Sequence, residues 1–473
     1  MPHIIPGQHI HLVGIGGAGL SAIARILIGQ GYKVSGSDRT LNALTDALAR
    51  DGAAIYSGHD AANIAGADAL IVSSAIKPDQ VEIAAALANG IPVYKRADIM
   101  ADLMVGKKVI AVAGTAGKTT TTAMITHILV ETGRDPSYII GGVLATTGQN
   151  AAVGKGDAFV VEADEYDNMF LGLRPNVAVV TNVEWDHPDF FKTPEDMQRS
   201  FEQFVSLLPK EGTLVAGLDG QGGYRLSQFA TRLNRFYTLW YSLADAQNTP
   251  RMVYNLIVAG DLHADALGTS LNTWATIAQE HRVPVRLQLA GKHNVQNATA
   301  AICAALAVGI EWREAAEALA TFKGTARRFE LKGEIAGIAV IDDYAHHPAK
   351  IRATLEAARS RYPDRQIWAV WQPHTYSRTQ ALRDDFITAF KDADHVLITD
   401  IYAAREQPIP GVNAADLAAQ IENAQYTPTF EDAVAALEVQ VKAPAAVIVM
   451  SAGDATQISA EYLRRKSNQW PSQ

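Results

Sequence analysis

The stretch KKVIAVAGTAGKTTTTAMITHILVETG, residues 107–133, decides the fold class of this chain. An apolar run leads into a glycine-rich turn and then into a threonine-rich segment, so we expect a strand, a loop and a helix. Glycines let such a loop curl until successive N–H groups face one anion, and the helix N-terminus adds the positive end of its dipole. Lys118 would then reach the terminal phosphates, and the Thr119 hydroxyl would coordinate Mg²⁺. The stretch predicts a nucleoside triphosphate site on an α/β sheet.

The loop is a shortened variant of the usual phosphate loop. The usual spacing places a glycine where Val112 stands, and the nearest glycine is Gly114. A chance glycine turn with polar helix caps is the alternative, but the strand, GK, TT and helix context disfavours it. The predicted nucleotide-binding residues of the loop are Gly114, Thr115, Ala116, Gly117, Lys118, Thr119 and Thr120.

A second glycine turn lies near the start of the chain, in HLVGIGGAGLSAIARIL, residues 11–27. Gly14, Gly16 and Gly19 have G-x-G-x-x-G spacing, and Asp38 follows where a dinucleotide-binding protein holds a ribose. Taken alone, this segment predicts an NAD-dependent oxidoreductase. That hypothesis leaves the phosphate loop and the last third of the chain without a role.

Composition and charge exclude several classes of protein. The 473 residues suffice for about three domains, and the net charge of −9 argues against a sequence-independent nucleic-acid binder. The single cysteine, Cys303, excludes an intrachain disulfide framework and lies in an apolar run. No apolar stretch is long enough to span a membrane, and MPHIIPGQ lacks signal-peptide features, so we expect a cytoplasmic protein.

Apolar runs alternate with helical spacing along the whole chain, which predicts α/β structure throughout. We expect three consecutive α/β domains: a Rossmann-like domain over residues 1–105, a central P-loop ATPase-like domain over 106–324, and a Rossmann-like domain over 325–473. Alternating and aromatic residues between about 236 and 290 predict some antiparallel structure there.

Acidic residues follow two of the predicted strands of the central domain. VVEADEYDNMF contains Glu162, Asp164, Glu165 and Asp167, and TNVEWDHPDF contains Asp186 and His187. Ligands gather at the carboxyl ends of strands in open α/β sheets, and carboxylate oxygens suit Mg²⁺. Each acid taken alone could merely cap a helix; the cluster beside a phosphate loop favours the metal.

The order of these motifs resembles one family. Several motifs follow one another over nearly the whole chain: the glycine turn, GTAGKTTTT, VEADEYD, TNVEWDH, GKHNVQNATAA, GTARRFE, IDDYAHHP and QPHTYSRT. Together they resemble those of the Mur ligases, which are ATP-dependent amide-forming enzymes of peptidoglycan precursor synthesis. The resemblance implies UDP-substrate binding by the first domain, ATP and magnesium binding by the second, and amino-acid binding by the third. It is strongest for the branch that joins L-alanine to UDP-N-acetylmuramate.

The resemblance also implies roles for residues outside the phosphate loop. Glu162 and His187 would hold magnesium together with Thr119. The residues that would contact ATP are His293, Asn294, Asn297, Arg327 and Asp342. Of these, Arg327 would contact a phosphate, and Asp342 would lie at the hinge to the third domain. Tyr344, His346, His374 and Arg378 would bind the amino acid. The UDP-substrate site would comprise Gly14, Gly16, Gly17, Ala18, Gly19, Asp38, Ser73 and Ser74.

Two positions depart from the family pattern. Ala116 stands where this branch usually has histidine in the loop (GTHGKT), and Thr375 stands where some relatives have arginine after QPH, which leaves Arg378 as the nearby cation. Backbone N–H groups, Lys118 and Thr119 carry the loop's binding function, so we expect ATP binding to survive. No counterpart to the carbamylated lysine of other Mur ligases is identifiable.

The implied reaction is phosphorylation of the lactyl carboxylate by ATP, followed by attack of the alanine amine on the acyl phosphate. The predicted catalytic residues are Lys118, His187, Arg327, His346, His347, His374 and Arg378. Among them, any one of His346, His347 and His374 could accept the amine proton. A murein tripeptide ligase, the oxidoreductase and a non-catalytic nucleotide-binding regulator remain alternatives, and the sequence leaves monomer or homodimer open.

Overall fold

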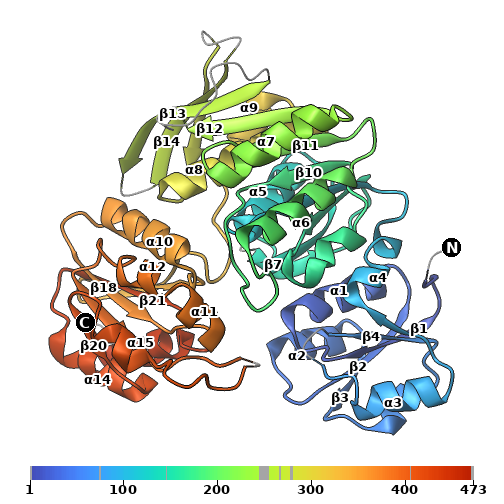
Figure 1. Cartoon of the computed structure of the whole chain (residues 1–473), viewed down its shortest axis with the longest axis horizontal. Helices are drawn as coiled ribbons and strands as arrows, with labels where there is room; N and C mark the ends of the chain where they lie inside the picture. The colour runs from blue at the N-terminus through green and yellow to red at the C-terminus, as the bar shows by residue number, and fades with distance from the viewer. Residues whose placement is uncertain are drawn as a thin grey trace.

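The computed structural model describes residues 3–73, 76–144, 146–243, 255–265, 268–276, 281–404 and 406–469, and three sheets follow one another along them (Figure 1). The first sheet is parallel and five-stranded, in the order β3-β2-β1-β4-β5. Its strands are β1 (His9–Val13), β2 (Lys33–Asp38), β3 (Ala54–Ser57), β4 (Ala69–Val72) and β5 (Val93–Lys95). Its helices are α1 (Ala18–Gly29), α2 (Ala43–Arg50), α3 (Val81–Ala88) and the short α4 (Arg96–Ile99).

The central sheet has ten strands, in the order β15-β14-β13-β12-β11-β10-β6-β9-β7-β8. They are β6 (Lys108–Ala113), β7 (Ser137–Leu144), β8 (Gln149–Ala152), β9 (Ala158–Glu162), β10 (Val177–Val180), β11 (Thr213–Gly217), β12 (Tyr237–Leu243), β13 (Leu256–Asp265), β14 (Gly268–Ala275) and β15 (Val283–Leu287). Helices α5 (Lys118–Glu131), α6 (Pro194–Ser206), α7 (Gln221–Leu233), α8 (Lys292–Ala307) and α9 (Trp312–Leu319) accompany it. The predicted antiparallel structure is present from residue 256 onward, whereas β12 pairs parallel with both of its neighbours.

The third sheet has six strands, in the order β16-β17-β21-β18-β19-β20, and only its edge strand β16 is antiparallel. Its strands are β16 (Glu330–Ile335), β17 (Ile338–Asp343), β18 (Gln366–Trp371), β19 (His395–Ile398), β20 (Ala424–Tyr426) and β21 (Ala445–Met450). Helices α10 (Pro348–Arg361), α11 (Tyr376–Ala381), α12 (Arg383–Ile387), α13 (Ala414–Ala418), α14 (Phe430–Gln440) and α15 (Thr456–Gln469) complete it.

Burial on both faces explains why these strands are continuous apolar runs in the sequence. Alternate residues of β21 belong to two separate cores, with Ala446, Ile448 and Met450 on one face of the sheet and Ala445, Val447 and Val449 on the other. A strand with period-2 side chains and two buried faces needs apolar residues at every position. The structure confirms the predicted fold class.

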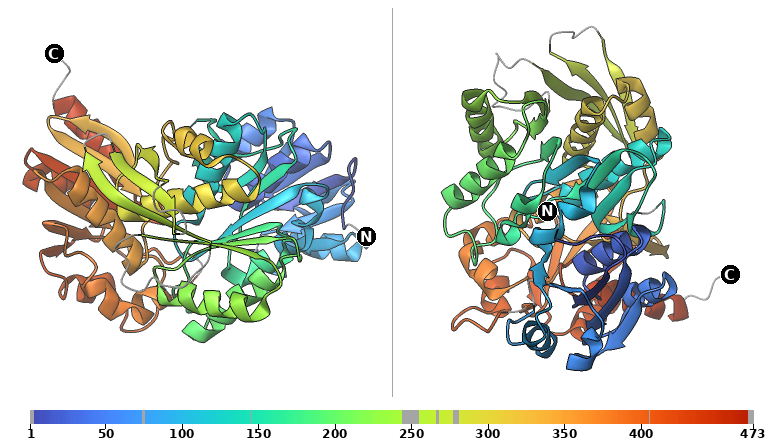
Figure 2. Two further views of the ribbon diagram at one scale, coloured as in Figure 1. Left: turned by 90° about the horizontal axis from the view of Figure 1, so that it is seen from above. Right: turned by 90° about the vertical axis from the view of Figure 1, so that its right-hand side faces the viewer.

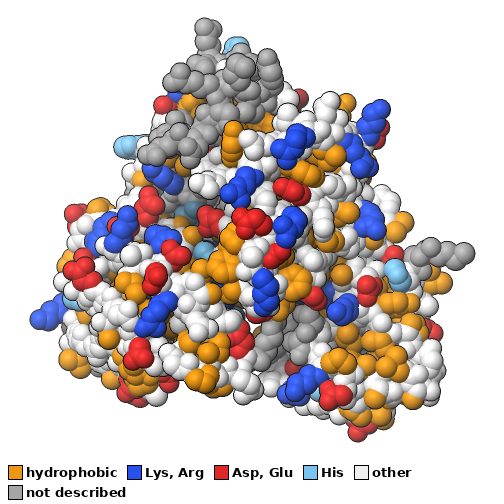
Figure 3. Space-filling view, viewed as in Figure 1, with side chains coloured by type: hydrophobic (Ala, Val, Ile, Leu, Met, Phe, Trp, Pro, Cys, Tyr) orange, Lys and Arg blue, Asp and Glu red, His pale blue; other side chains and the backbone are white. Residues whose placement is uncertain are grey.

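The central domain lies against both of the others. Helix α1 packs on β7 and β8, and α10 of the third domain packs near α8 and β13 (Figures 1 and 2). Within the described parts of the chain, no helix combines the length and the apolar character needed to cross a bilayer. Positive and negative side chains are interspersed on the face drawn in Figure 3.

Candidate active site

A cavity of about 620 Å³ lies between the central and third domains. It is lined on one side by segments that follow β6, β9 and β10, and on the other by segments that follow β17, β18 and β21. The carboxyl edges of two parallel sheets therefore face each other across one space, which is where such sheets bind ligands.

The phosphate loop forms one wall of this cavity. Gly117, at φ +85°, is the residue before α5, and Lys118 begins the helix. Lys118 Nζ donates to the Gly114 carbonyl at 2.5 Å and lies 2.7 Å from a carboxylate oxygen of Glu165. Gly114, Gly117 and the buried start of α5 thus give the loop the curled shape that the sequence predicts.

Ala116 is held by the end of the neighbouring strand rather than by its own side chain. Its N–H donates to Asn182 Oδ1 at 2.9 Å, and its carbonyl accepts from the Thr181 hydroxyl at 2.5 Å. Thr115 is fixed in the same way, because its hydroxyl donates to the Glu184 carbonyl at 2.7 Å. The loop keeps its shape without the histidine that is usual at position 116.

The Lys118–Glu165 pair is charged. Burial alone would lower the pKa of Lys118, but the Glu165 and Asp164 carboxylates raise it. Burial likewise opposes ionisation of Glu165, but Lys118 and His187 hold the pKa of that carboxyl below its usual value. The Glu165 side chain, only 1% exposed, therefore neutralises the lysine from within the protein.

The predicted metal ligands Thr119 and Glu162 meet in the cavity. Thr119 Oγ1 donates to Glu162 Oε1 at 3.1 Å, close to the roughly 3 Å that separates neighbouring ligands of an octahedral Mg²⁺ ion. His187 lies nearby but is turned toward the acids, with Nε2 3.5 Å from Glu165 Oε1. No three of the described His, Cys, Asp and Glu side chains form a complete metal site by themselves. A hydroxyl and a carboxylate oxygen at this spacing fit magnesium, which prefers oxygen ligands and needs only a few of them from the protein.

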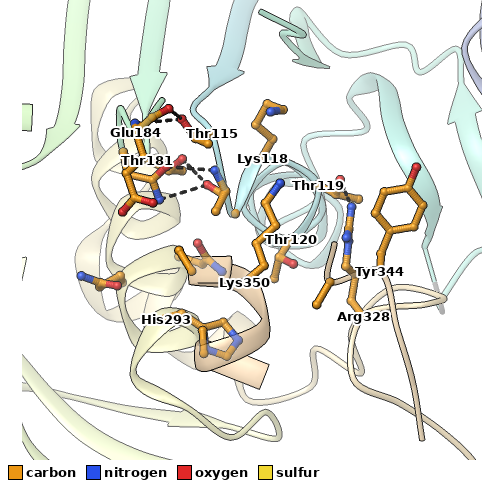
Figure 4. A pocket seen from close by; sticks show the side chains of 18 of the residues that line it. Thr115, Lys118, Thr119, Thr120, Thr181, Glu184, His293, Arg328, Tyr344 and Lys350 are labelled. Carbon is orange, nitrogen blue, oxygen red and sulfur yellow. Dashed lines mark hydrogen bonds between the residues drawn. The ribbon is translucent and has the colours of Figure 1, made fainter. Parts of the chain in front are cut away.

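The two arginines at the hinge have different hydrogen-bond partners, although both guanidinium groups lie over the Tyr344 ring, at 4.9 and 4.6 Å from its centre. Arg327, at φ +60°, is not a lining residue of the cavity and donates to the carbonyls of Ser451 and Gly453 at 2.8 and 2.9 Å. Arg328 lines the cavity and donates to Thr119 Oγ1 at 3.0 Å (Figure 4). The structure does not bring the predicted phosphate-contacting Arg327 to the phosphate loop. Its neighbour Arg328 contacts the loop instead, because Arg327 is held by the carbonyls that follow β21.

The two adjacent aspartates of IDDYAHHP, Asp342 and Asp343, also have different surroundings. Asp342 faces α15, where its buried carboxylate accepts from the Ser459 hydroxyl, and burial raises its pKa to about 6. Asp343 lines the cavity and accepts from the N–H of Phe329 at 2.7 Å and that of Ala345 at 2.8 Å. Asp343 is thus the carboxylate that fastens the hinge, and Asp342, predicted for that position, lies on the opposite face of β17.

A buried ion pair joins the second and third domains beside the cavity. Arg378 contacts Asp186 Oδ1 through Nε at 3.0 Å and Nη2 at 2.9 Å. Burial opposes ionisation of Asp186, yet Arg378 holds its pKa well below the usual range. Arg378 also lies 3.1 Å from His374 Nδ1, so the cation predicted for the amino-acid site is first of all a link between domains.

The two adjacent histidines are buried and uncharged at neutral pH. Burial, reinforced by Lys350 and Arg378, lowers the pKa of His346 well below its usual value, and burial lowers that of His347 to about 4. His346 lines the cavity 5.7 Å, ring to ring, from His374, and Tyr344 lines it beside them. His347 caps α10 and is not a lining residue.

The start of α8 closes the cavity behind the phosphate loop. It contributes three lining residues, His293, Asn294 and Asn297, whose predicted place near the adenine and the metal stays a prediction. Burial lowers the pKa of His293 to about 4, which keeps the imidazole neutral. Asn297 Oδ1 accepts from the Thr121 hydroxyl at 3.3 Å, so α8 and α5 are joined at this point.

The glycine turn of the first domain lies apart from this cavity, and its described residues do not line it. Asp38 Oδ2 accepts from the Gly16 N–H at 2.9 Å, so this aspartate shapes the turn. A Cβ at Gly19 would collide with the guanidinium of Arg96, a cation that the sequence motifs did not single out. Gly14, Gly17, Ala18 and Ser73 lie in or beside the same turn, and Ser74 lies outside the described residues.

Family models match along the chain in the order of the three sheets. The Mur ligase family catalytic domain matches residues 9–108, the Mur ligase middle domain residues 112–305, and the Mur ligase glutamate ligase domain residues 327–453. The chain belongs to the Mur ligase family. The glycine turn is therefore part of a Mur ligase domain, and the oxidoreductase hypothesis drops out.

Relatives of this Mur ligase carry one recurring name. A UDP-N-acetylmuramate--L-alanine ligase of Roseiflexus sp. is 43% identical over 95% of this chain and 97% of its own length. A ligase of the same name from Desulfatibacillum aliphaticivorans is 38% identical over 97% of this chain and 98% of its own length. The crystal structure of a UDP-N-acetylmuramate-alanine ligase from Thermotoga maritima superposes with a TM-score of 0.80 and 25% sequence identity, and the match covers 98% of this chain and 100% of that one. The crystal structure of a murein peptide ligase from Psychrobacter arcticus superposes with a TM-score of 0.71 and 27% sequence identity, and the match covers 98% of this chain and 99% of that one.

The site residues that the sequence motifs missed share one property: each acts through a distant segment. Arg328 contacts Thr119 and Asn182 contacts Ala116, and Lys350 enters the cavity from the third domain. The two adjacent arginines of GTARRFE were a signal in the sequence for an arginine at the phosphate loop. The motif did not indicate which of the two contacts the loop.

Proposed function

We propose that this chain is an ATP-dependent ligase that joins L-alanine to the lactyl carboxylate of UDP-N-acetylmuramate in peptidoglycan precursor synthesis. One observation carries the proposal: the GTAGKTTTT loop and the DDYAHH loop face each other across a single cavity. The phosphoryl donor ATP and the attacking amine of the amino acid can therefore meet in this cavity. The names of the near-full-length relatives supply the substrates.

The chemistry follows from this placement. A carboxylate oxygen is a poor leaving group, so the lactyl carboxylate attacks the γ-phosphorus of ATP, the bond to the β-phosphate oxygen breaks, and ADP leaves. The alanine amine attacks the resulting acyl phosphate, loses a proton, and phosphate departs. Lys118 and Arg328, which both line the cavity, would offset charge on the transferring group. In such a reaction, positioning and electrostatics supply most of the catalysis.

Thr119 and Glu162 would hold a magnesium ion, which offsets the negative charge of the phosphates when it is bound. The chain's own part in the metal site is to keep two oxygen donors about one ligand spacing apart. Glu162 is oriented for this by the Gly141 N–H, which donates to Glu162 Oε2 at 2.7 Å.

His374 and His346 are the proposed acceptors of the amine proton. Both line the cavity on its third-domain side, and His346 is neutral, as a proton acceptor must be. UDP is proposed to bind at the glycine turn of the first domain, where α1 begins and the Arg96 guanidinium lies over Gly19. We place the reaction in the cytoplasm.

One assay tests the function. ADP release is measured with ATP, magnesium and UDP-N-acetylmuramate, and with L-alanine, glycine, L-serine or the murein tripeptide as acceptor. We expect turnover that requires both the UDP-sugar and L-alanine. Turnover only with the tripeptide would replace the proposal by the second candidate, which the likeness to a murein peptide ligase favours. Binding of ATP and the UDP-sugar with no amide product would support the regulator hypothesis.

A further inference from the structure

Lys350 is a cavity residue to which the mechanism above gives no task. It lies in the first turn of α10, two residues after the start of that helix at Pro348. Its side chain is 19% exposed, and it lines the cavity from the third-domain side. Figure 4 shows it extending toward the start of α5, where Lys118 and Thr120 lie.

Two ammonium groups thus converge on the same space. Burial, and the charge of Lys118 with it, lowers the pKa of Lys350 to about 8, against the opposing effect of Asp186. Lys350 still carries its proton at neutral pH. Glu165 neutralises Lys118, whereas Lys350 has only a share of the Asp186 carboxylate, so an anionic group bound between the two ammonium groups would stabilise them together.

The acid nearest Lys350 is already engaged elsewhere. Asp186 Oδ2 lies 4.0 Å from Lys350 Nζ, while Oδ1 of the same carboxylate accepts two bonds from Arg378. One carboxylate therefore serves two cations. Lys118, by contrast, has a carboxylate oxygen of Glu165 at 2.7 Å.

We infer that Lys350 is a further cation for the phosphoryl group in transit, in addition to Lys118 and Arg328, and that it acts from the acceptor side of the cavity while Lys118 acts from the donor side. The inference rests on the proposed function and adds a residue to it. In the first step the carboxylate oxygen bonds to the γ-phosphorus and ADP leaves; in the second the acyl carbon–oxygen bond breaks and phosphate takes that electron pair. Lys350 would contact the phosphoryl oxygens of the acyl phosphate and of the departing phosphate.

This assignment makes the reaction depend on domain docking. Lys118 reaches the phosphates from the central domain, whereas Lys350 is carried by the third domain on α10. The acceptor-side charge is therefore in place only when the two sheets face each other as in this structure.

The test uses the full-length protein with Lys350→Met and Lys350→Arg, and Lys332→Gln as the matched control. Lys332 is an exposed lysine of β16 paired with Glu330, outside the cavity. Steady-state ADP release gives kcat and the KM for ATP. Inorganic phosphate serves as a product inhibitor, and thermal unfolding checks the fold.

We expect Lys350→Met to lower kcat by about 10²-fold, the size typical of losing one preorganised charge at a transition state. The KM for ATP should change far less and inhibition by phosphate should weaken. Tm should change little, because Asp186 keeps both of its bonds from Arg378. Lys350→Arg should restore most of the turnover, and Lys332→Gln should behave as the wild type.

A Lys350→Met enzyme whose kcat or phosphate inhibition matches the wild type would overturn the inference while leaving the ligase assignment intact. A fall in Tm that Lys350→Arg repairs without restoring phosphate inhibition would reduce Lys350 to a structural partner of Asp186, and would equally overturn it. A wild-type enzyme that forms no amide would remove the proposed function itself, a result visible before any variant is made.

Discussion

Lys118 and Glu165 depend on each other for charge balance. The ammonium and carboxylate lie 2.7 Å apart, and the Glu165 side chain is 1% exposed. Removing one member of a buried pair leaves an uncompensated charge, which costs about 3–5 kcal/mol.

Lys118→Ala should therefore abolish turnover and also lower Tm. The double variant Lys118→Met/Glu165→Gln should recover much of the Tm without recovering turnover, because the stranded carboxylate is gone and the phosphate-binding cation is still missing. Calorimetry and ADP release measure the two effects separately. An unchanged Tm in Lys118→Ala would show that Glu165 finds another partner.

Glu82 stabilises the first domain in a pH-dependent way. Its fully buried carboxylate accepts from Ser37 Oγ at 2.7 Å, Asn63 Nδ2 at 2.8 Å and Gln80 Nε2 at 2.8 Å. Burial opposes ionisation, but these bonds and the neighbouring His11 bring the pKa down from 4.5 to about 2.

A depressed carboxyl pKa contributes stability above the unfolded-state value, here 4.5, that is lost as pH falls toward 2. The contribution at neutral pH is roughly 3 kcal/mol. Glu82→Gln should lower Tm at pH 7, and its difference from the wild type should shrink steadily between pH 4.5 and 2. Glu195→Gln, on the exposed side of α6, is the control. A difference that does not depend on pH would contradict the assignment.

At the scale of elements, the junction between β6 and α5 requires glycine, and Gly117 is the position directly before the helix. Gly117 has φ +85°, and a Cβ there would collide with Asn297 Oδ1 of α8. Gly133, just beyond the other end of the same helix, has φ +72° but no atom within 4 Å of an added Cβ.

Gly117→Ala should therefore lose ATP binding and most turnover, since backbone strain and a collision act together. Gly133→Ala should cost only the left-handed backbone penalty, about 1–2 kcal/mol, with ATP affinity retained. Equilibrium nucleotide titration and thermal unfolding separate the two. Equal ATP affinity in both variants would mean that the loop tolerates a side chain at 117.

Apolar periodicity predicted the elements well because it reflects burial. The strands β6 and β21 are recognisable in the sequence because every residue in their centres is buried and apolar. Short edge strands such as β3 and β20 are hard to recognise in the sequence, because partly exposed strands need few apolar residues.

At the scale of the whole molecule, the Asp186–Arg378 pair holds two domains together. Its partners are 192 positions apart in the chain, and the side chains are 1% and 5% exposed. Arg359 and Asp394 form a pair of the same chemistry inside the third domain, with 35% and 42% exposed side chains.

Arg378→Ala should lower Tm, raise the KM for the amino acid and enlarge the radius of gyration measured by small-angle scattering, because a buried charge loses its partner and the domains separate. Arg359→Ala should change stability by less than about 1 kcal/mol, as is usual for exposed pairs, and leave the radius unchanged. Equal radii in the two variants would remove the role of Asp186–Arg378 in docking.

The sequence by itself determined the order of the main strands and helices, the glycine-rich loop at 114–120 and the family, because these depend on local periodicity, glycine content and motif order. Only the tertiary structure decided that Arg328 rather than Arg327 contacts Thr119, that Asp343 rather than Asp342 fastens the hinge, and that Lys350 enters the cavity. Asp342 and Asp343 are adjacent on β17 and point to opposite faces, so their identities alone leave the direction open. Which face meets the cavity is decided by the packing of one domain on another, and that information is spread over residues far apart in the chain.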